Sequence, residues 1–479
     1  MEKEDELLQR IAADEGHADW LRDAGTVIAA VSGGPDSMAL LHMLLRMAKA
    51  QPFRLIAAHV NHRFRGAESD AEAKLVAQTA ENWGIPLEAA AIDVPLFIEE
   101  TGMNAQAAAR QKRYEFLLQT AARHGAGHLL LGHHADDQAE TVLMRVLRGT
   151  GVSGLAGIPY RRKINKVELI RPLLRITKGE LLAYCERNGV PYALDSSNGN
   201  RHYFRNVVRL DLLPMLEGHN PRLKESLIRL ADLAASDDDY LESEAARFLD
   251  ETAIRSGEGF QVVRRRFGSF HIALQRRMIK LILKCCANGW QSLAFQQIEA
   301  ILEAMNDNSA AVTRLDVGGG WVFVREYDKV YIGPPQPEQR SYCCRIAEFP
   351  CALAPGNGWF LQAERAEGAV DPLPDNRWEA RFDESSLSLP LAVRTRRPGD
   401  RLEPSGLNGT KKVQDMFVDA KIPRSERDGW PLIADAQERI LWIPGLRRSR
   451  LALTSADTRK IVRIRVQHPG LRVPDRSDT

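Results

Sequence analysis

The hydrophobic pattern of the chain changes character twice. Up to about residue 195, short apolar runs alternate with stretches in which apolar positions recur at helical spacing. The runs that predict strands are 26–31, 54–60, 87–94, 128–132 and 167–170, and the helical stretches are 38–48, 68–83, 104–124, 135–148 and 177–188. Strands that are apolar throughout are buried on both faces. The alternation therefore predicts a doubly wound, mostly parallel α/β sheet of Rossmann-like type.

Helical patterns dominate from residue 222 to 305, and a hairpin-like alternation follows over 321–332. The stretch Pro334-Pro335-Gln336-Pro337 predicts a linker, beyond which short mixed elements follow. We therefore expect an α/β domain over 1–215, a mainly helical domain over 216–335, a small mixed α/β domain over 341–468 and a disordered tail over 469–479.

Composition narrows the class of protein. A chain of 479 residues with 44% hydrophobic and 27% charged residues is typical of a soluble protein of about three domains. The acidic start is unlike a signal peptide and no apolar run has membrane-spanning length, so we expect a cytoplasmic protein without a membrane partner. None of the six cysteines forms C-x-x-C, which argues against a zinc or dithiol redox site. The net charge of +2 does not by itself indicate a nucleic-acid binder.

The first predicted strand ends in a glycine-rich loop, Ser32-Gly33-Gly34-Pro35-Asp36-Ser37, and a helical stretch follows at once. Where a strand leads through a glycine turn into a helix, the backbone N–H groups of the turn and the helix dipole can both face a bound anion. The two glycines allow the main chain to approach phosphate oxygens closely. The sequence therefore predicts a phosphate-binding loop, and it is not a Walker loop because no G-x-x-x-x-G-K-[ST] string occurs.

An acidic stretch follows the predicted strand 128–132. Asp136 and Glu140 are four residues apart, and Asp137 and Glu140 three apart, so they share one helix face. Because neighbouring carboxylates repel, this face needs a cation, for which a magnesium ion or a substrate amine is suitable.

Arginines supply the opposite charge in two other stretches. Arg110 and Arg113 lie on one predicted helix, and Arg201, Arg205 and Arg209 follow the segment Asp195-Ser196-Ser197-Asn198. Arginine forks suit bidentate contacts to phosphate.

These motifs carry a family resemblance. The string SGGPDS resembles the pyrophosphate loop of the N-type ATP pyrophosphatases. Four further stretches follow it along the chain: HVNHRFRGAES (59–69), GHHADDQAET (132–141), the pattern from Asp195 to Arg209 and the basic stretch from Arg396 to Ile433. Together they are similar to the bacterial tRNA(Ile)-lysidine synthetase family over nearly the whole chain, with small departures at Asn61 and Leu194-Asp195.

The resemblance implies a reaction and its partners. ATP with Mg²⁺ would adenylate O2 of the wobble cytidine of tRNA(Ile) with a CAU anticodon, and the side-chain amine of L-lysine would then attack C2 and expel AMP. The product, lysidine, changes the specificity of the tRNA from methionine to isoleucine. The resemblance also suggests a homodimer.

The resemblance implies residue roles as well. The catalytic set is Asp36, Arg113, His133 and Arg205, of which Asp36 holds magnesium and the others stabilise charge at the α-phosphate and the activated cytidine. The loop Ser32, Gly33, Gly34, Pro35, Asp36 and Ser37 would bind the β- and γ-phosphates of ATP. Asp137 and Glu140 would bind the lysine amines. A nearby carboxylate or His133 could accept the proton from the attacking amine, and the sequence does not choose between them.

Basic residues gather in the predicted third domain, where they would hold the tRNA backbone. The tRNA-binding set that we expect is Arg396, Arg397, Arg401, Lys411, Lys412, Lys421 and Arg424. Acidic residues such as Asp400 and Glu403 are interleaved with them, so an ordinary charged surface is the alternative.

Two other functions are alternatives to a lysidine synthetase. A tRNA 2-thiolation enzyme of the same superfamily would need paired cysteines for sulfur or an iron–sulfur cluster, which this chain lacks. A non-catalytic tRNA-binding protein would not need the complete loop and acidic motifs.

Overall fold

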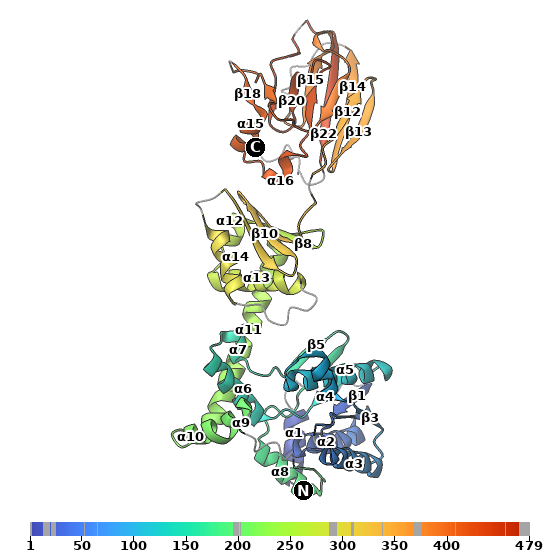
Figure 1. The fold of residues 1–479 in the computed structure, drawn as a ribbon, viewed down its shortest axis with the longest axis vertical. Helices are drawn as coiled ribbons and strands as arrows, with labels where there is room; N and C mark the ends of the chain where they lie inside the picture. The colour runs from blue at the N-terminus through green and yellow to red at the C-terminus, as the bar shows by residue number, and fades with distance from the viewer. Residues whose placement is uncertain are drawn as a thin grey trace. The chain divides into compact units, whose positions relative to one another are not determined.

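The computed structural model describes residues 2–12, 20, 25–51, 53–64, 66–194, 201, 203–286, 295–307, 311–337, 339–367, 376–407, 409–455 and 457–468. The chain divides into two compact units, Met1–Leu241 and Glu242–Thr479 (Figure 1). The expected tail over 469–479 and the segment 195–198 lie outside the described residues.

The first unit is built on a six-stranded sheet of order β3-β2-β1-β4-β6-β5. Its elements, in chain order, are α1 (Glu2–Ala12), β1 (Thr26–Ala30), α2 (Pro35–Ala50), β2 (Arg54–Asn61), α3 (Ala67–Asn82), β3 (Leu87–Ala91), α4 (Val94–Thr101), α5 (Ala105–Arg123), β4 (His128–Leu131), α6 (Ala135–Arg148), α7 (Val152–Leu155), β5 (Arg161–Ile164), β6 (Val167–Ile170), α8 (Lys178–Asn188), α9 (Phe204–Val207), the π-helical turn η3 (Val208–Leu212), α10 (Leu213–Glu217) and α11 (Leu223–Thr252), which continues into the second unit. The predicted mostly parallel α/β sheet is confirmed, since β5 is its single antiparallel strand among the described residues.

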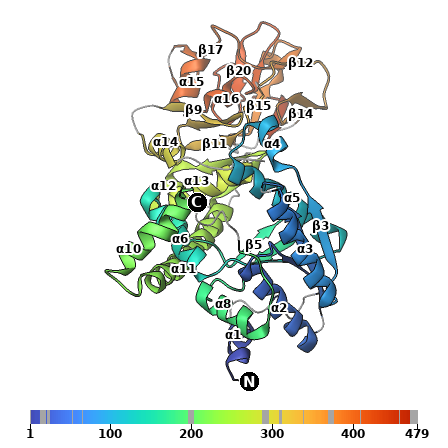
Figure 2. The same ribbon diagram turned by 60° about the horizontal axis from the view of Figure 1, so that its bottom comes forward.

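Alternate residues of β1 enter two different cores, which explains why the whole strand is apolar. Val27 and Ala29 pack in a cluster with residues of α2 and α8, whereas Ile28 packs in a second cluster with residues of α5. Helices therefore cover both faces of the sheet at its centre (Figure 1, Figure 2). The sequence did not predict β5, because an edge strand of composition Arg-Arg-Lys-Ile is largely exposed and carries no apolar run.

The second unit contains more β-structure than its sequence suggests. Its elements, in chain order, are β7 (Ala253–Ser256), β8 (Gly259–Val263), α12 (Arg264–Gly268), α13 (Ile272–Cys286), α14 (Phe295–Asn306), β9 (Val312–Gly318), β10 (Trp321–Glu326), β11 (Lys329–Gly333), β12 (Cys343–Ile346), β13 (Cys351–Gly356), β14 (Trp359–Glu367), β15 (Glu379–Asp383), the 3₁₀ turn η4 (Glu384–Ser386), β16 (Leu391–Arg394), β17 (Arg401–Leu402), β18 (Lys411–Lys412), α15 (Val413–Asp419), α16 (Arg424–Arg427), β19 (Leu432–Ala434), β20 (Ile440–Ile443), β21 (Arg447–Arg448) and β22 (Lys460–Gln467).

The expected hairpin over 321–332 forms as β10 and β11, but it belongs to a five-stranded antiparallel sheet, β7-β8-β11-β10-β9. The edge strands β7 and β9 are largely exposed, so their hydrophobic alternation is weak and the sequence did not predict them. Helices α12, α13 and α14 contribute to the same core as this sheet.

The last part of the chain forms two larger sheets, β12-β16-β19-β20-β21 and β13-β14-β22-β15. Both contribute to one core with α15, in which Trp359 and Trp430 meet edge to face with ring centroids 5.0 Å apart. Among the described residues, no helix is long and apolar enough to cross a membrane.

Candidate nucleotide and substrate site

Four neighbouring parallel strands bring polar residues to one edge of the first sheet. The strands β2, β1, β4 and β6 are followed, within two residues of their ends, by His62, Ser32, His133 and Arg171 respectively. The carboxyl ends of parallel strands are where ligands bind in doubly wound sheets. The site is therefore assembled from segments more than 100 residues apart in the chain.

The loop after β1 has the geometry of an anion cradle. Gly33 adopts φ +92°, which favours glycine, and Gly34 caps α2, whose first residue is Pro35. The hydroxyl of Ser37 accepts a hydrogen bond from the Ser32 N–H at 3.1 Å and donates one to the Gly34 carbonyl at 3.0 Å. The first N–H groups of α2 have no partner within the helix, so they are available to a phosphate.

Gly132 brings the turn after β4 against this loop. A Cβ atom at residue 132 would lie 3.2 Å from both the Cα and the N of Ser37 and 3.3 Å from the carbonyl carbon of Asp36. These contacts are with backbone, which cannot swing aside as a side chain can.

The Gly132→Ala variant should therefore displace the loop by a few tenths of an ångström. It should slow the adenylation that the family resemblance implies by about tenfold, with a loss of about 1 kcal/mol of unfolding free energy. Pyrophosphate release and urea unfolding measure the two effects. Gly127→Ala is the matched control, because a Cβ there meets nothing within 4 Å. Equal effects of the two substitutions would contradict the proposed contact.

The acidic helix face binds two arginines in the described structure. Glu140 is 1% exposed and accepts hydrogen bonds from Nε of Arg205 at 2.7 Å and Nε of Arg209 at 2.5 Å. Arg205 also donates to Asp137 at 2.7 Å. Burial would raise the pKa of Asp137, but His134, Arg205 and His133 outweigh it and lower that pKa. The two predicted lysine-binding carboxylates thus lie together, and the Arg205 guanidinium already pairs with both.

A second group of charges surrounds the predicted magnesium ligand. Nζ of Lys178 lies 2.6 Å from both carboxylate oxygens of Asp36, and Nε2 of His134 lies 3.7 Å from one of them. Asp136 accepts a hydrogen bond from the Lys178 backbone N–H at 2.8 Å and lies 3.1 Å from Nζ of Lys224. Burial opposes a charge on His134, but the nearby carboxylates of Asp136, Asp137 and Asp36 outweigh it and raise the pKa of its imidazole.

Arg113 belongs to a group of side chains that carry only positive charge or none. Its Nε is enclosed without a hydrogen-bond partner, and in the described part of the chain no carboxylate pairs with it. Burial lowers the pKa of Arg113. Burial and the charge of Arg113 lower the pKa of His62 to about 4. Burial also lowers the pKa of His133 to about 3, because burial and the charges of Arg171 and Arg113 outweigh Asp137, which would raise it. Nε of Arg171 and Nδ1 of His133 are likewise enclosed and unpartnered. Enclosed positive groups without a carboxylate partner are suited to bind an anion.

Several residues of this site carry no predicted role. His62 and Arg171 were detectable in principle, since each directly follows a parallel strand. Arg209 was noted only as one of several arginines. Lys178 had no sequence signal, because nothing in its neighbourhood indicates a long-range partner.

The predicted tRNA-binding residues lie in the second unit and differ in their pairing. Arg396, Arg397 and Lys411 pair with Asp428, Glu438 and Asp419, and Arg401 donates to Thr410. Lys412, Lys421 and Arg424 are exposed, and the described residues provide no ion pair for them.

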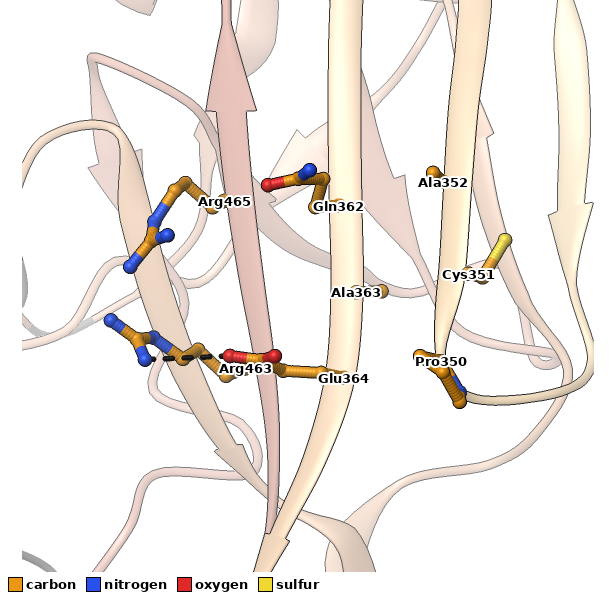
Figure 3. Close-up of a pocket in the computed structure, with 8 residues that line it drawn as sticks. All are labelled: Pro350, Cys351, Ala352, Gln362, Ala363, Glu364, Arg463 and Arg465. Carbon is orange, nitrogen blue, oxygen red and sulfur yellow. Dashed lines mark hydrogen bonds and ion pairs between the residues drawn. The ribbon is translucent and has the colours of Figure 1, made fainter.

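Figure 3 shows a pocket of about 340 Å³ in the second unit, against β13, β14 and β22. Its Arg463 and Arg465 are already paired with Glu379, at distances of 2.7 and 3.1 Å. None of the predicted site residues lines this pocket.

Comparison with known proteins identifies the family. A PP-loop domain model matches residues 3–216, a TilS substrate binding domain model matches 264–331, and a TilS substrate C-terminal domain model matches 391–466. A tRNA(Ile)-lysidine synthase from Geobacillus kaustophilus is 37% identical over 92% of this chain and 95% of its own length. The chain belongs to the tRNA(Ile)-lysidine synthase family. The predicted family resemblance is therefore confirmed.

A second curated relative agrees with this assignment. A tRNA(Ile)-lysidine synthase from Bacillus subtilis is 36% identical over 88% of this chain and 90% of its own length. A crystal structure of a TilS C-terminal domain is 38% identical, covers 28% of this chain and 100% of its own, and has a TM-score of 0.25.

Proposed function

We propose that this protein is a cytoplasmic, ATP-dependent ligase that joins L-lysine to C2 of the wobble cytidine of an isoleucine tRNA with a CAU anticodon. One observation carries the proposal beyond family membership. The edge of the first sheet holds a carboxylate pair, Asp137 and Glu140, beside enclosed, unpartnered nitrogen atoms of Arg113, His133 and Arg171. An amine donor and a phosphoryl intermediate need these two environments side by side.

In the adenylation step the cytidine O2 attacks the α-phosphorus of ATP, a bond forms between them, and pyrophosphate leaves. The loop Ser32–Ser37 would hold the departing phosphates through its N–H groups. Arg113 and the neutral imidazole of His133 would donate hydrogen bonds to oxygens of the α-phosphate, where negative charge increases. Because Arg113 is enclosed before the substrate arrives, little reorganisation is needed.

In the second step the ε-ammonium of lysine loses one proton, and the resulting amine attacks C2. The bond from C2 to O2 breaks, AMP leaves with the O2 oxygen, and the nitrogen gives up a second proton and keeps one N–H. The amines of the incoming lysine would lie on Asp137 and Glu140, where Arg205 now donates hydrogen bonds. A lysine bound there would replace part of the arginine contact and free the Arg205 guanidinium for the adenylate, which is the role that the sequence analysis predicts for it. A carboxylate or His133 would accept the proton.

Magnesium fits the donor set at Asp36. Among the described residues no three His, Cys, Asp or Glu side chains are placed to hold a metal ion. Mg²⁺ is commonly held by one or two carboxylates together with substrate phosphates, and Asp36 lies in the loop that would bind those phosphates. When bound, the ion would neutralise charge on the phosphates of ATP.

The tRNA would be held by the second unit. Lys412, Lys421 and Arg424 are exposed and provide the best candidates for phosphate contacts, whereas Arg396, Arg397 and Lys411 would first have to leave their acidic partners. A homodimer remains a prediction from the family resemblance.

The deciding experiment uses purified protein, labelled lysine, ATP with magnesium, and isoleucine and methionine tRNAs that share the CAU anticodon. We expect lysine to enter only the isoleucine tRNA, and AMP release to disappear in Asp36→Ala. AMP release without lysine incorporation would keep the adenylating site but contradict the proposed product.

A further inference from the structure

Lys178 makes the closest ion pair of the phosphate-binding loop. Its Nζ is 2.6 Å from Oδ1 and 2.6 Å from Oδ2 of Asp36, so it contacts both oxygens that a metal ion would use. Asp36 cannot hold Lys178 in this way and a divalent cation at the same time, because both need the same lone pairs.

The backbone of Lys178 is fixed next to the loop. It is the first residue of α8, capped by Thr177 through a reciprocal hydrogen-bonded pair with Glu180, and its N–H donates to Asp136. Helix α8 packs on α2, and the Ala193 N–H donates to the Gly33 carbonyl at 2.9 Å. Only the flexible four-carbon stem can move, and the Lys178 side chain is 36% exposed.

The surrounding charges disfavour a bare metal ion. Within the described part of the chain, each of the four carboxylates Asp36, Asp136, Asp137 and Glu140 already contacts a lysine or an arginine. A divalent cation that arrived alone would displace the ammonium of Lys178 without providing a new anion for it, so its binding would be opposed. ATP brings several negative charges to the same loop and removes this obstacle.

We propose that Lys178 is an exchange residue of the nucleotide site: it neutralises Asp36 while the site lacks ATP, and it transfers to a phosphate of ATP when Mg²⁺ takes Asp36. This inference rests on the proposed ATP-dependent function. This exchange would make metal binding depend on nucleotide. Lys178 would have two anionic partners, a carboxylate and a phosphate, both within reach of its flexible side chain.

The test is Mn²⁺ binding measured by electron paramagnetic resonance without nucleotide, a readout independent of turnover. The wild-type protein should bind Mn²⁺ weakly, and Lys178→Met should bind it at least about tenfold more tightly. Lys178→Arg restores the positive charge and should restore the exclusion of Mn²⁺. The exposed Lys166→Met is the matched control and should behave as wild type. The double variant Asp36→Asn, Lys178→Met should lose the gain, which locates the ion at Asp36.

A second measurement separates this proposal from the proposed function. Calorimetry of ATP with Mg²⁺ should show about tenfold weaker binding to Lys178→Met than to wild type. Wild-type protein that binds no ATP would contradict the proposed function itself. A different result would overturn the exchange but not the proposed function: wild-type protein binds ATP normally, and without nucleotide it binds Mn²⁺ as tightly as Lys178→Met does. If Lys178→Met does not fold, Mn²⁺ binding to wild-type protein with and without ATP decides, because equal affinities contradict the exchange.

Discussion

Methionine in place of Arg113 should reduce the rate of adenylation by about 10²- to 10³-fold, the usual effect of removing one preorganised donor to a developing oxyanion. Arg113 is the strongest candidate for this effect, because its Nε is enclosed and has no partner in the described structure. Pyrophosphate release with ATP and the CAU isoleucine tRNA measures the rate. The unfolding free energy should stay equal or rise, since burial lowers the pKa of this guanidinium and therefore disfavours its charge in the folded state.

The matched control for Arg113→Met lies on the same helix. Arg123→Met removes an arginine that is 55% exposed and pairs at 3.0 Å with Glu88, which lies at the amino end of β3 and not at the carboxyl ends that form the site. It should leave adenylation unchanged. An Arg113→Met variant that adenylates normally, or that loses rate only because it unfolds, would rule out a direct role of this guanidinium.

Glutamine in place of Glu140 should reduce lysine incorporation by about 100-fold, and adenylation should persist. The carboxylate is almost completely buried and accepts hydrogen bonds from two arginines. An amide would leave Arg205 and Arg209 with Asp137 as the one remaining carboxylate of this pair, so their positive charge would be compensated only in part. We expect a loss of about 2 kcal/mol of unfolding free energy, less than for fully buried pairs, because the side chains of Arg205 and Arg209 are 37% and 34% exposed to water.

Two assays separate the effects of Glu140→Gln. Labelled lysine in tRNA reports the second step, AMP or pyrophosphate release reports the first, and urea unfolding reports stability. The exposed Glu186→Gln is the control and should match wild type in all three assays. Equal loss of both steps would mean that Glu140 supports the fold of the site without a specific role towards lysine.

Taken together, these substitutions test a division of the site by charge. Asp137 and Glu140 lie on one side with arginines that can be exchanged, and Arg113, His133 and Arg171 on the other with enclosed nitrogen atoms that lack partners. Under the proposed function, this division would keep an ammonium and a phosphate in separate environments until both are bound. It would also explain why Arg205 was predicted at the phosphate but lies on the carboxylates in the described structure.

The local pattern of the chain determined the fold of the first unit and the two principal motifs. A strand that is buried on both faces is recognisable in the sequence because every position must be apolar. The glycine loop is recognisable because a positive φ and a helix start each need particular residues. The exposed edge strands β5, β7 and β9 did not stand out, since solvent contact removes the constraint on their composition.

The partners within the site were decided by tertiary structure alone. The sequence determined that Asp36, Asp137, Glu140 and Arg113 would be functional candidates, because each lies in a motif with local meaning. It could not determine that Lys178 contacts Asp36 across 142 positions, or that Arg209 shares Glu140 with Arg205. Electrostatic partners are chosen by distance in space, and the sheet topology that sets those distances joins strand ends whose order in space differs from their order along the chain.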